Sequence, residues 1–127
     1  MEINYDSLNN LVIKNRQYIE IIKGKYLYLM SMLTSVSYLT TDNFINSVEK
    51  ISQNGIIYIA YVGNISDFSF DIIASGTVLI EQKIIHDAKS VGHIEDIVVH
   101  NKYRGNGISK IIVDHLVEYS KKKNCYK

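Results

Sequence analysis

The sequence predicts an α/β (α+β) domain in which helices flank a central sheet. Three runs rich in β-branched and aromatic residues, at 56–62, 71–85 and 92–99, have the composition of strands. Apolar residues recur every three or four positions before residue 56 and after residue 107, which is typical of the buried face of a helix. The length of 127 residues, 46% of them hydrophobic and 21% charged, fits one globular domain.

The first half of the chain predicts one strand and two helices. Residues 1–17 are Asn-rich and weakly patterned, so we expect an N-terminal extension or a loose first helix there, and a folded domain over 18–127. The short β-branched run 18–23 predicts a first strand. Helical spacing predicts a helix over 25–36. A second helix is expected to start at a cap formed by Thr41 or Asp42 and to end at Asn54-Gly55.

The second half predicts three strands and a closing helix. The strands 56–62 and 71–85 are expected to form a hairpin through a polar turn at 63–70, and 92–99 is the next strand. A helix then starts at Gly107. Its buried face is predicted to carry Ile108, Ile111, Ile112, Leu116 and Tyr119. One more strand is expected to start at Tyr126.

Composition argues against several classes of function. The net charge is +1 and the lysines are scattered, so we expect no nucleic-acid partner. We see neither a signal peptide nor an uncharged stretch of membrane-spanning length, and we expect no membrane partner. The single cysteine, Cys125, cannot form an internal disulfide, and no motif gives it a histidine partner for catalysis. These features favour a cytoplasmic protein.

The segment most indicative of chemistry is 93–99 (HIEDIVV), which carries the adjacent carboxylates Glu95 and Asp96. A carboxylate can accept the proton that an attacking amine must lose. Neighbours on a regular strand face opposite sides, so both could line one site only if a bulge re-aims one of them. The alternative interpretation is a salt-bridged sheet edge.

The glycine turn Gly105-Asn106-Gly107 follows directly. A dinucleotide fingerprint would need a third glycine where Lys110 stands, and a Walker-type loop would need Gly-Lys-Ser/Thr. Two interpretations remain. The turn and the helix after it could hold an anion such as a pyrophosphate, with charge added by Arg104 and Lys110, or the glycines could simply make a strand-to-helix turn.

Residues 104–109 (RGNGIS) resemble the Arg/Gln-x-x-Gly-x-Gly/Ala signature of the GCN5-related N-acetyltransferase (GNAT) superfamily, with Ser109 in the final small position. Several segments in order then resemble one family within it, glucosamine 6-phosphate N-acetyltransferase. These segments are 33–36 (LTSV), 81–86 (EQKIIH), 92–97 (GHIEDI), 102–105 (KYRG) and 125–127 (CYK). The likeness runs from about residue 18 to 127.

The resemblance implies a mixed, mostly antiparallel twisted sheet and an acetyl transfer from acetyl-CoA to the amine of D-glucosamine 6-phosphate. The product would be N-acetylglucosamine 6-phosphate, for UDP-N-acetylglucosamine biosynthesis. The resemblance further implies a homodimer working without a metal. Two alternatives stay open: an acetyltransferase for another small amine, and an inactive, truncated acyl-CoA-binding domain.

The resemblance also implies roles for individual residues. Glu95 and Asp96 would be catalytic. The substrate would be held by Thr34, Lys83, Ile84, Ile85, His86, Glu95, Asp96, Ile97, Tyr126 and Lys127. The cofactor would be held by Ile97, Val98, Val99, Gly105, Asn106, Gly107, Ile108, Ser109 and Lys110.

Beyond the match at 125–127, the family continues with a strand, a helix and a final strand. That region brings an aspartate for the substrate amine, a tyrosine that protonates the leaving thiolate, and basic contacts to the phosphate. The given sequence ends at Lys127. We therefore expect a C-terminally shortened fold, either as a fragment or as a short homologue, and activity of the 127-residue chain stays an open question.

Overall fold

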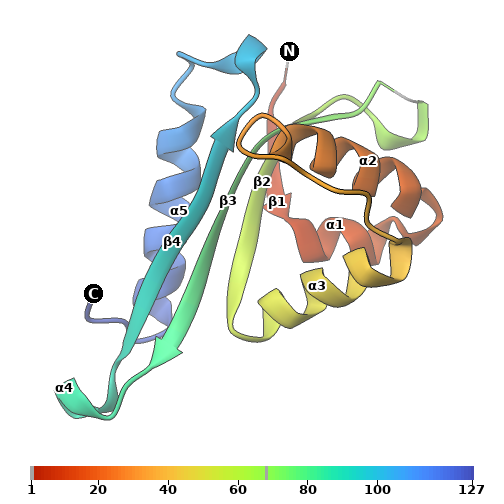
Figure 1. The fold of residues 1–127 in the computed structure, drawn as a ribbon. Coiled ribbons are helices and arrows are strands. Elements are labelled where there is room, and N and C mark those ends of the chain that lie inside the picture. Colours follow the sequence, from red (N-terminus) through yellow and green to blue (C-terminus); the bar gives the residue numbers. More distant parts are fainter. Residues whose placement is uncertain (1, 68) are drawn as a thin grey trace.

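A four-stranded antiparallel sheet organises the chain (Figure 1). In the computed structural model, which describes residues 2–67 and 69–127, the sheet order is β1-β2-β3-β4. Met1 of the predicted extension and Phe68 of the predicted turn lie outside the described residues. The strands are β1 (Asn4–Ser7), β2 (Gly55–Val62), β3 (Asp71–Gln82) and β4 (Ser90–Val99).

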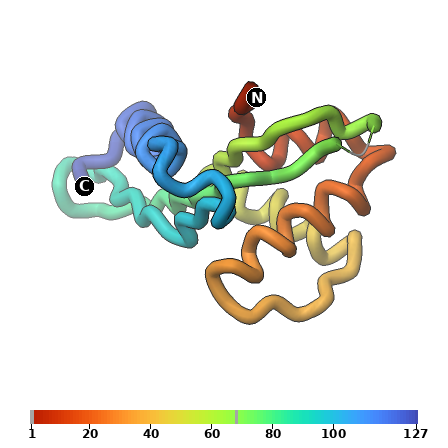
Figure 2. The backbone as a smooth tube through the Cα atoms, turned by 90° about the horizontal axis from the view of Figure 1, so that it is seen from above, coloured from red at the N-terminus to blue at the C-terminus, as the bar shows by residue number. Residues whose placement is uncertain are grey.

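Helices cover both faces of the sheet (Figures 1 and 2). One face carries three helices, which are α1 (Leu8–Lys14), α2 (Ile19–Met30) and α3 (Thr41–Gln53). The other face carries α5 (Ile108–Lys122). A short helical turn, α4 (Ile85–Ala88), joins β3 to β4 at one end of the sheet. None of the described helices is long and apolar enough to cross a bilayer.

Alternation along the strands divides the core into two apolar clusters. On the side of α1–α3, Ile57 and Ile59 of β2 pack with Ile22, Leu29 and other buried residues. On the side of α5, the cluster consists of Ala60, Val62, Ile73, Ala74, Val78, Ile108, Ile112 and Leu116. The sheet therefore separates two apolar clusters, one on each of its faces. β4 is an edge strand, and the glycine turn and α5 follow its end.

The predicted strand at 18–23 is wrong, because these residues belong to α2 and the 3-10 turn before it. Burial follows a helical period, with Ile22 and Leu29 both fully buried against the sheet. The exposed Gly24 interrupts the apolar pattern and made a short β-branched run look like a strand. The predicted helix at 25–36 accordingly starts earlier, at Ile19, and ends at Met30.

Several boundaries shift by a few residues. The cap of α3 is Thr40, whose hydroxyl accepts a hydrogen bond from the Asn43 backbone N–H, where Thr41 or Asp42 was predicted. The strand predicted over 71–85 ends at Gln82. Residues expected to be an extension or loose helix form β1, which pairs with β2, and α1, whose Leu8, Leu11 and Val12 are buried.

Two details at the end of the chain are wrong: Ile111, predicted on the buried face of α5, is 46% exposed, and no strand starts at Tyr126, since only an isolated bridge forms at Cys125. The order of the later elements is confirmed. β2 and β3 form the hairpin, β4 follows, and Gly107 is the residue before α5. The last residues lie parallel to the start of β4: Ser90 and Cys125 form a parallel bridge, and the Gly92 N–H donates to the Lys127 carbonyl. The pairings among the four strands are all antiparallel, as the mostly antiparallel sheet of the resemblance implies, and this isolated bridge is the parallel pairing seen among the described residues.

Candidate active site

A β-bulge in β4 decides where the two carboxylates lie. Ser75 pairs with Val98 and Thr77 pairs with Glu95, so Asp96 and Ile97 together stand opposite Gly76 alone. Asp96 adopts a left-handed backbone with φ of 55°, which aspartate tolerates better than most residues. Because of the extra residue, the alternation of side chains along β4 is broken at this point.

Gly76 leaves room for the bulge. A Cβ at this position would lie 2.5 Å from Cδ1 of Ile97 and 2.6 Å from Cγ2 of Ile112. Ile97 therefore packs across the backbone of Gly76 toward α5. Because Gly76 has no side chain, Asp96 and Ile97 of β4 can both fit opposite it and point to different faces of the sheet.

The first of two cavities, the carboxylate cavity, lies between the sheet, α2 and α3 and has a volume of about 250 Å³. Both Glu95 and Asp96 line it, together with Thr77 of β3 and Ser47 of α3. The rest of its wall is mostly apolar: Tyr26, Leu27, Met30, Leu39, Phe44, Val48, Ile51, Ile57 and Leu79. The bulge thus brings both acidic residues to one hollow, as the sequence analysis required for a shared site.

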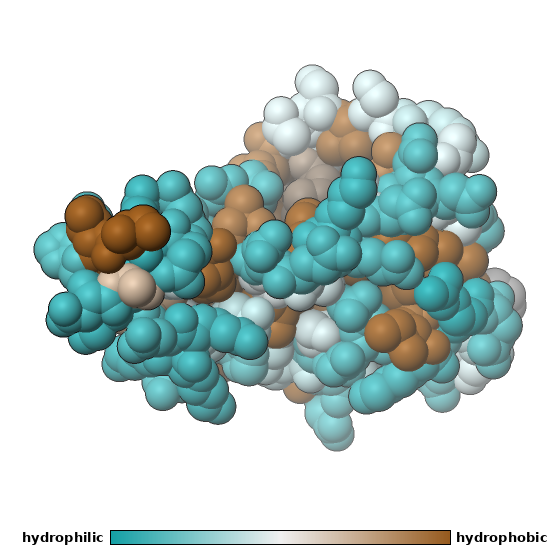
Figure 3. All heavy atoms as spheres, turned by 90° about the horizontal axis from the view of Figure 1, so that it is seen from below, coloured by the Kyte–Doolittle hydropathy of each residue, from teal (hydrophilic) through white to brown (hydrophobic). Residues whose placement is uncertain are grey.

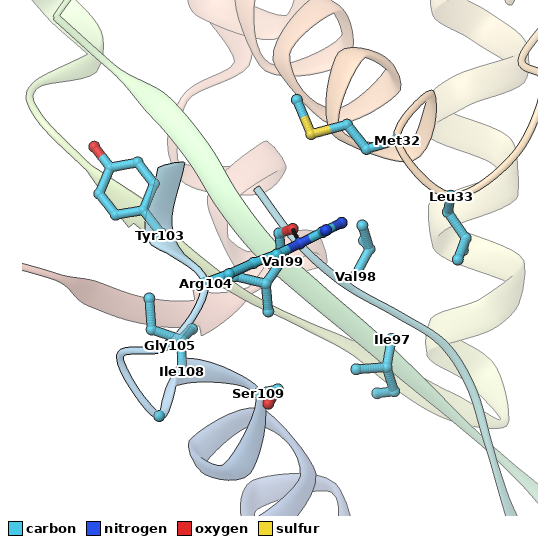
Figure 4. A pocket seen from close by; sticks show the side chains of 11 residues that line it. Met32, Leu33, Ile97, Val98, Val99, Tyr103, Arg104, Gly105, Ile108 and Ser109 are labelled. Carbon is cyan, nitrogen blue, oxygen red and sulfur yellow. Dashed lines mark hydrogen bonds between the residues drawn. The ribbon is translucent and has the colours of Figure 1, made fainter. Parts of the chain in front are cut away.

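The second, the turn cavity, has a volume of about 370 Å³ and lies where β4 runs into the glycine turn (Figure 4). Its residues come from the turn after α2, from β4, and from the glycine turn with the first residues of α5. They are Met32, Leu33, Ile97, Val98, Val99, Tyr103, Arg104, Gly105, Gly107, Ile108 and Ser109. Glu95 and Asp96 line the carboxylate cavity and the next three residues line the turn cavity, so β4 borders both.

The geometry of the glycine turn suits an anion. Gly105 and Gly107 have φ of 84° and 73°, values that residues with a Cβ adopt only with strain. No atom lies within 4 Å of a Cβ built on either glycine, so space remains beside the backbone. The first N–H groups of α5 have no acceptor within the helix and carry its positive dipole end. Backbone N–H groups can therefore approach a phosphate here.

The basic side chains near the turn already have partners. The Nε of Arg104 donates to the Val99 carbonyl at 3.3 Å, which folds this side chain against the end of β4. Lys110 Nζ lies 2.6 Å from a carboxylate oxygen of Asp114, one helical turn along. Asn106 donates from its side-chain amide to the Tyr103 carbonyl. Arg104 lines the turn cavity, whereas Lys110 and Asn106 do not.

Comparison with known proteins decides the family. The model of the acetyltransferase (GNAT) family matches residues 29–127, which include both cavities' β4 residues and the whole glycine turn. The chain belongs to the GNAT acetyltransferase family.

Among GNAT proteins, this chain is similar to those that act on an amino-sugar phosphate. Glucosamine 6-phosphate N-acetyltransferase of Arabidopsis thaliana is 32% identical over 102 residues, covering 80% of this chain and 68% of that protein. The enzyme of the same name from Candida albicans is 32% identical over 104 residues, covering 82% of this chain and 68% of its own length. The family resemblance seen in the sequence is confirmed.

Solved structures agree. The crystal structure of the Arabidopsis thaliana enzyme superposes with a TM-score of 0.81 at 25% identity, covering all of this chain and 80% of that one. An acetyltransferase from Trypanosoma brucei superposes with a TM-score of 0.80 at 24% identity, covering 99% of this chain and 80% of the other, and supports the fold.

The GNAT fold brings most of the predicted cofactor residues together. Ile97, Val98, Val99, Gly105, Gly107, Ile108 and Ser109 all line the turn cavity, and Asn106 and Lys110 flank them in sequence. Thr34 follows the cavity residue Leu33, and its N–H donates to the Met30 carbonyl. Thr34 thus lies in the segment that leaves α2 beside β4.

The other predicted substrate residues lie together elsewhere, around α4. The rings of His86 and Tyr126 are 4.2 Å apart, and Tyr126 and Lys127 line a smaller hollow with Gly92 and Ile94. Ile84 is 91% exposed and Ile85 62% exposed, and Figure 3 shows apolar side chains at the surface of this end of the molecule. Neither cavity of the site is lined by residues 83–86.

Lys83 is part of an exposed ionic cluster. Its Nζ lies 3.0 Å from Glu81, whose other carboxylate oxygen is 2.9 Å from Nε2 of His93. Hydrogen bonds from His93 and Lys83 lower the pKa of the Glu81 carboxyl. A phosphate that bound Lys83 would compete with Glu81 for the ammonium group.

Sequence reasoning missed part of both cavities. Met32 and Tyr103 line the turn cavity, and Tyr26 and Thr77 line the carboxylate cavity. The position of Tyr103 beside Arg104 in the matched segment 102–105 was a usable signal. Nothing local marked Tyr26, because α2 meets the bulge of β4 only in the folded chain.

Proposed function

We propose that this protein transfers the acetyl group of acetyl-CoA to the 2-amino group of glucosamine 6-phosphate. The observation that carries the proposal is the bulge at Asp96, which aligns two carboxylates on one hollow while the same strand borders a second hollow ending at a glycine turn. Relatives of the same family that bear this activity in their names are 32% identical to the chain over 102 and 104 aligned residues. In this proposal the turn cavity holds acetyl-CoA, and the carboxylate cavity receives the amine.

The turn cavity has the features that acetyl-CoA requires. The N–H groups of residues 105–109 would face the pyrophosphate, and the open edge of β4 at Ile97 to Val99 would offer backbone groups to the pantetheine arm. The positive φ of Gly105 and Gly107, with free space beside them, supports this fit. When bound, acetyl-CoA supplies an activated acyl group.

The carboxylates would handle the proton of the amine. An amine attacks a thioester only as the neutral base, so Glu95 or Asp96 would accept one proton, directly or through a water. The new C–N bond forms as the C–S bond breaks, and the electron pair of that bond leaves with the thiolate. A backbone N–H of the bulged segment would stabilise the negative charge that develops on the acyl oxygen.

The sugar phosphate would be bound by residues of two subunits. In a single chain, residues 83–86 and Tyr126 lie around α4, and they line neither cavity of the site. In a homodimer, which we include in the proposal, these residues of one subunit would complete the site of the other. Lys83 would act on the phosphate as a point charge. Such an enzyme would work in the cytoplasm, in the biosynthesis of UDP-N-acetylglucosamine.

The test is detection of the acetylated sugar phosphate by mass spectrometry, using the full chain, acetyl-CoA and glucosamine 6-phosphate. Two variants report on the bulge carboxylates: Glu95→Gln and Asp96→Asn, of which the second keeps a residue that tolerates left-handed backbone. We expect at least one of them to lower kcat by about 10²- to 10⁴-fold. Turnover unchanged in both variants would remove the carboxylates from the mechanism, and no product from the wild type would overturn the proposal.

A further inference from the structure

The hydroxyls of a partly buried tyrosine and a fully buried serine meet next to the bulge. The Oη of Tyr26, from α2, lies 3.2 Å from Oγ of Ser75, from β3, although the two residues are 49 positions apart in sequence. Ser75 is fully buried. It stands directly before Gly76, at the point where the β3–β4 register shifts, and Tyr26 lines the carboxylate cavity with Glu95 and Asp96.

The pair has one O–H donor more than its mutual hydrogen bond uses. Two hydroxyls carry two O–H donors, and their mutual hydrogen bond uses one of them. No other hydrogen bond from either side chain is formed with the described residues, 2–67 and 69–127. Donors away from bulk solvent are nearly always satisfied, so the second O–H is available to an acceptor outside this set, either water or a bound molecule.

The cavity is where that acceptor must come from. Tyr26 is the wall residue, and its ring is held by Phe44 at a centroid distance of 6.1 Å. Burial, with a smaller contribution from the charge of Asp96, raises the pKa of the Tyr26 hydroxyl, so it remains a neutral donor over the whole physiological range. A donor close to two carboxylates can bind a neutral oxygen of a molecule whose amine is held by those carboxylates.

We propose that the Tyr26–Ser75 hydroxyl pair is a specificity-determining element that donates one hydrogen bond to an oxygen of the acceptor amine, such as a sugar hydroxyl. The inference rests on the proposed function, because it takes the carboxylate cavity as the side that receives the acceptor. It adds a preference for acceptors that carry a hydroxyl near the amine over plain alkylamines. When an acceptor without this hydroxyl binds, the O–H of the pair is left without a partner, and this cost disfavours plain alkylamines.

The test compares Tyr26→Phe with the wild type in binding and turnover of glucosamine 6-phosphate. The variant keeps the ring and removes the hydroxyl, so we expect KM for the acceptor to rise about three- to tenfold while the affinity for acetyl-CoA stays unchanged. Tyr61→Phe is the matched control: Tyr61 lies in the same apolar cluster, contacts Phe70 by its ring and forms no hydrogen bond through its hydroxyl to the described residues.

Deoxy analogues of the acceptor give the decisive comparison. For the analogue that lacks the partner hydroxyl, the wild type and Tyr26→Phe should bind equally, because the interaction is already gone. An equal loss with every analogue would show a purely structural role and overturn the inference. So would an unchanged KM in Tyr26→Phe when turnover is intact, and that result would leave the proposed function standing. A wild type that binds no glucosamine 6-phosphate would contradict both.

Discussion

Gly76→Ala tests whether the bulge depends on a missing side chain. The added methyl group would lie 2.5 Å from Ile97 Cδ1, 2.6 Å from Ile112 Cγ2 and 3.1 Å from Leu116 Cδ1. Ile112 and Leu116 are fully packed in α5, so they have little room to withdraw. Overpacking of this kind costs about 1–3 kcal/mol.

The expected change in melting temperature follows from the size of the domain. Unfolding entropy is about 2.1 cal/mol/K per residue, which for 127 residues gives about 0.27 kcal/mol/K. A loss of about 1–3 kcal/mol then lowers Tm by about 4–11 °C. Because Ile97 lines the turn cavity and is displaced by the methyl group, the affinity for acetyl-CoA should fall as well.

The matched control is Gly24→Ala in α2. A Cβ at Gly24 meets no atom within 4 Å, and alanine favours the helix interior over glycine by about 0.5–1 kcal/mol. Thermal unfolding of both variants, followed by calorimetric titration with acetyl-CoA, separates the two effects. If Gly76→Ala melts at or above the wild-type temperature and binds acetyl-CoA normally, the packing argument for the bulge is refuted.

Three further predictions follow from other parts of the structure. Burial, with a smaller contribution from Lys122, lowers the pKa of His115, whose ring stacks on Tyr58 at 3.5 Å. The neutral ring therefore stabilises the fold above the unfolded pKa of about 6.5, and this stability is lost as the pH falls through the lower folded pKa. In a pH series of denaturant melts, His115→Phe should reduce the fall in the free energy of unfolding between neutral and acidic pH. An unchanged dependence of that free energy on pH would contradict the prediction. Lys83→Ala should raise KM for glucosamine 6-phosphate by about tenfold or more without changing that for glucosamine, and an equal change for both sugars would argue against a phosphate contact. Gly107→Ala should weaken acetyl-CoA binding through backbone strain of about 1–2 kcal/mol at φ 73°, and calorimetry showing wild-type affinity would remove the turn from the binding site.

The sequence predicted those elements whose signals are local. The β-branched runs of β2, β3 and β4 and the glycine before α5 mark their own boundaries, and the structure has them within a few residues. The start of α2 was missed because 18–23 is short and β-branched, and packing against the sheet makes it helical. Local preference is weak there, and tertiary burial of Ile22 outweighs it.

In the candidate site, too, the features that are local in sequence could be predicted and those that depend on tertiary pairing could not. The carboxylates and the glycine turn are contiguous in sequence, and the family resemblance names them. The bulge that joins Glu95 and Asp96 to one cavity depends on a glycine in a neighbouring strand, and the Tyr26–Ser75 pair depends on a helix that meets that strand. Such relations arise from the pairing of distant segments, so no pattern within one segment predicts them.

The most direct test of the account is a competition between two acceptors in one reaction. The full chain is given acetyl-CoA and equal amounts of glucosamine 6-phosphate and glucosamine, and the two acetylated products are measured by mass, which gives the ratio of their kcat/KM values. We predict that the phosphorylated product exceeds the other by about tenfold or more, because in the proposed function Lys83 and its neighbours would contact the phosphate. Equal amounts of the two products, or acetylation of neither sugar, would contradict the central claim.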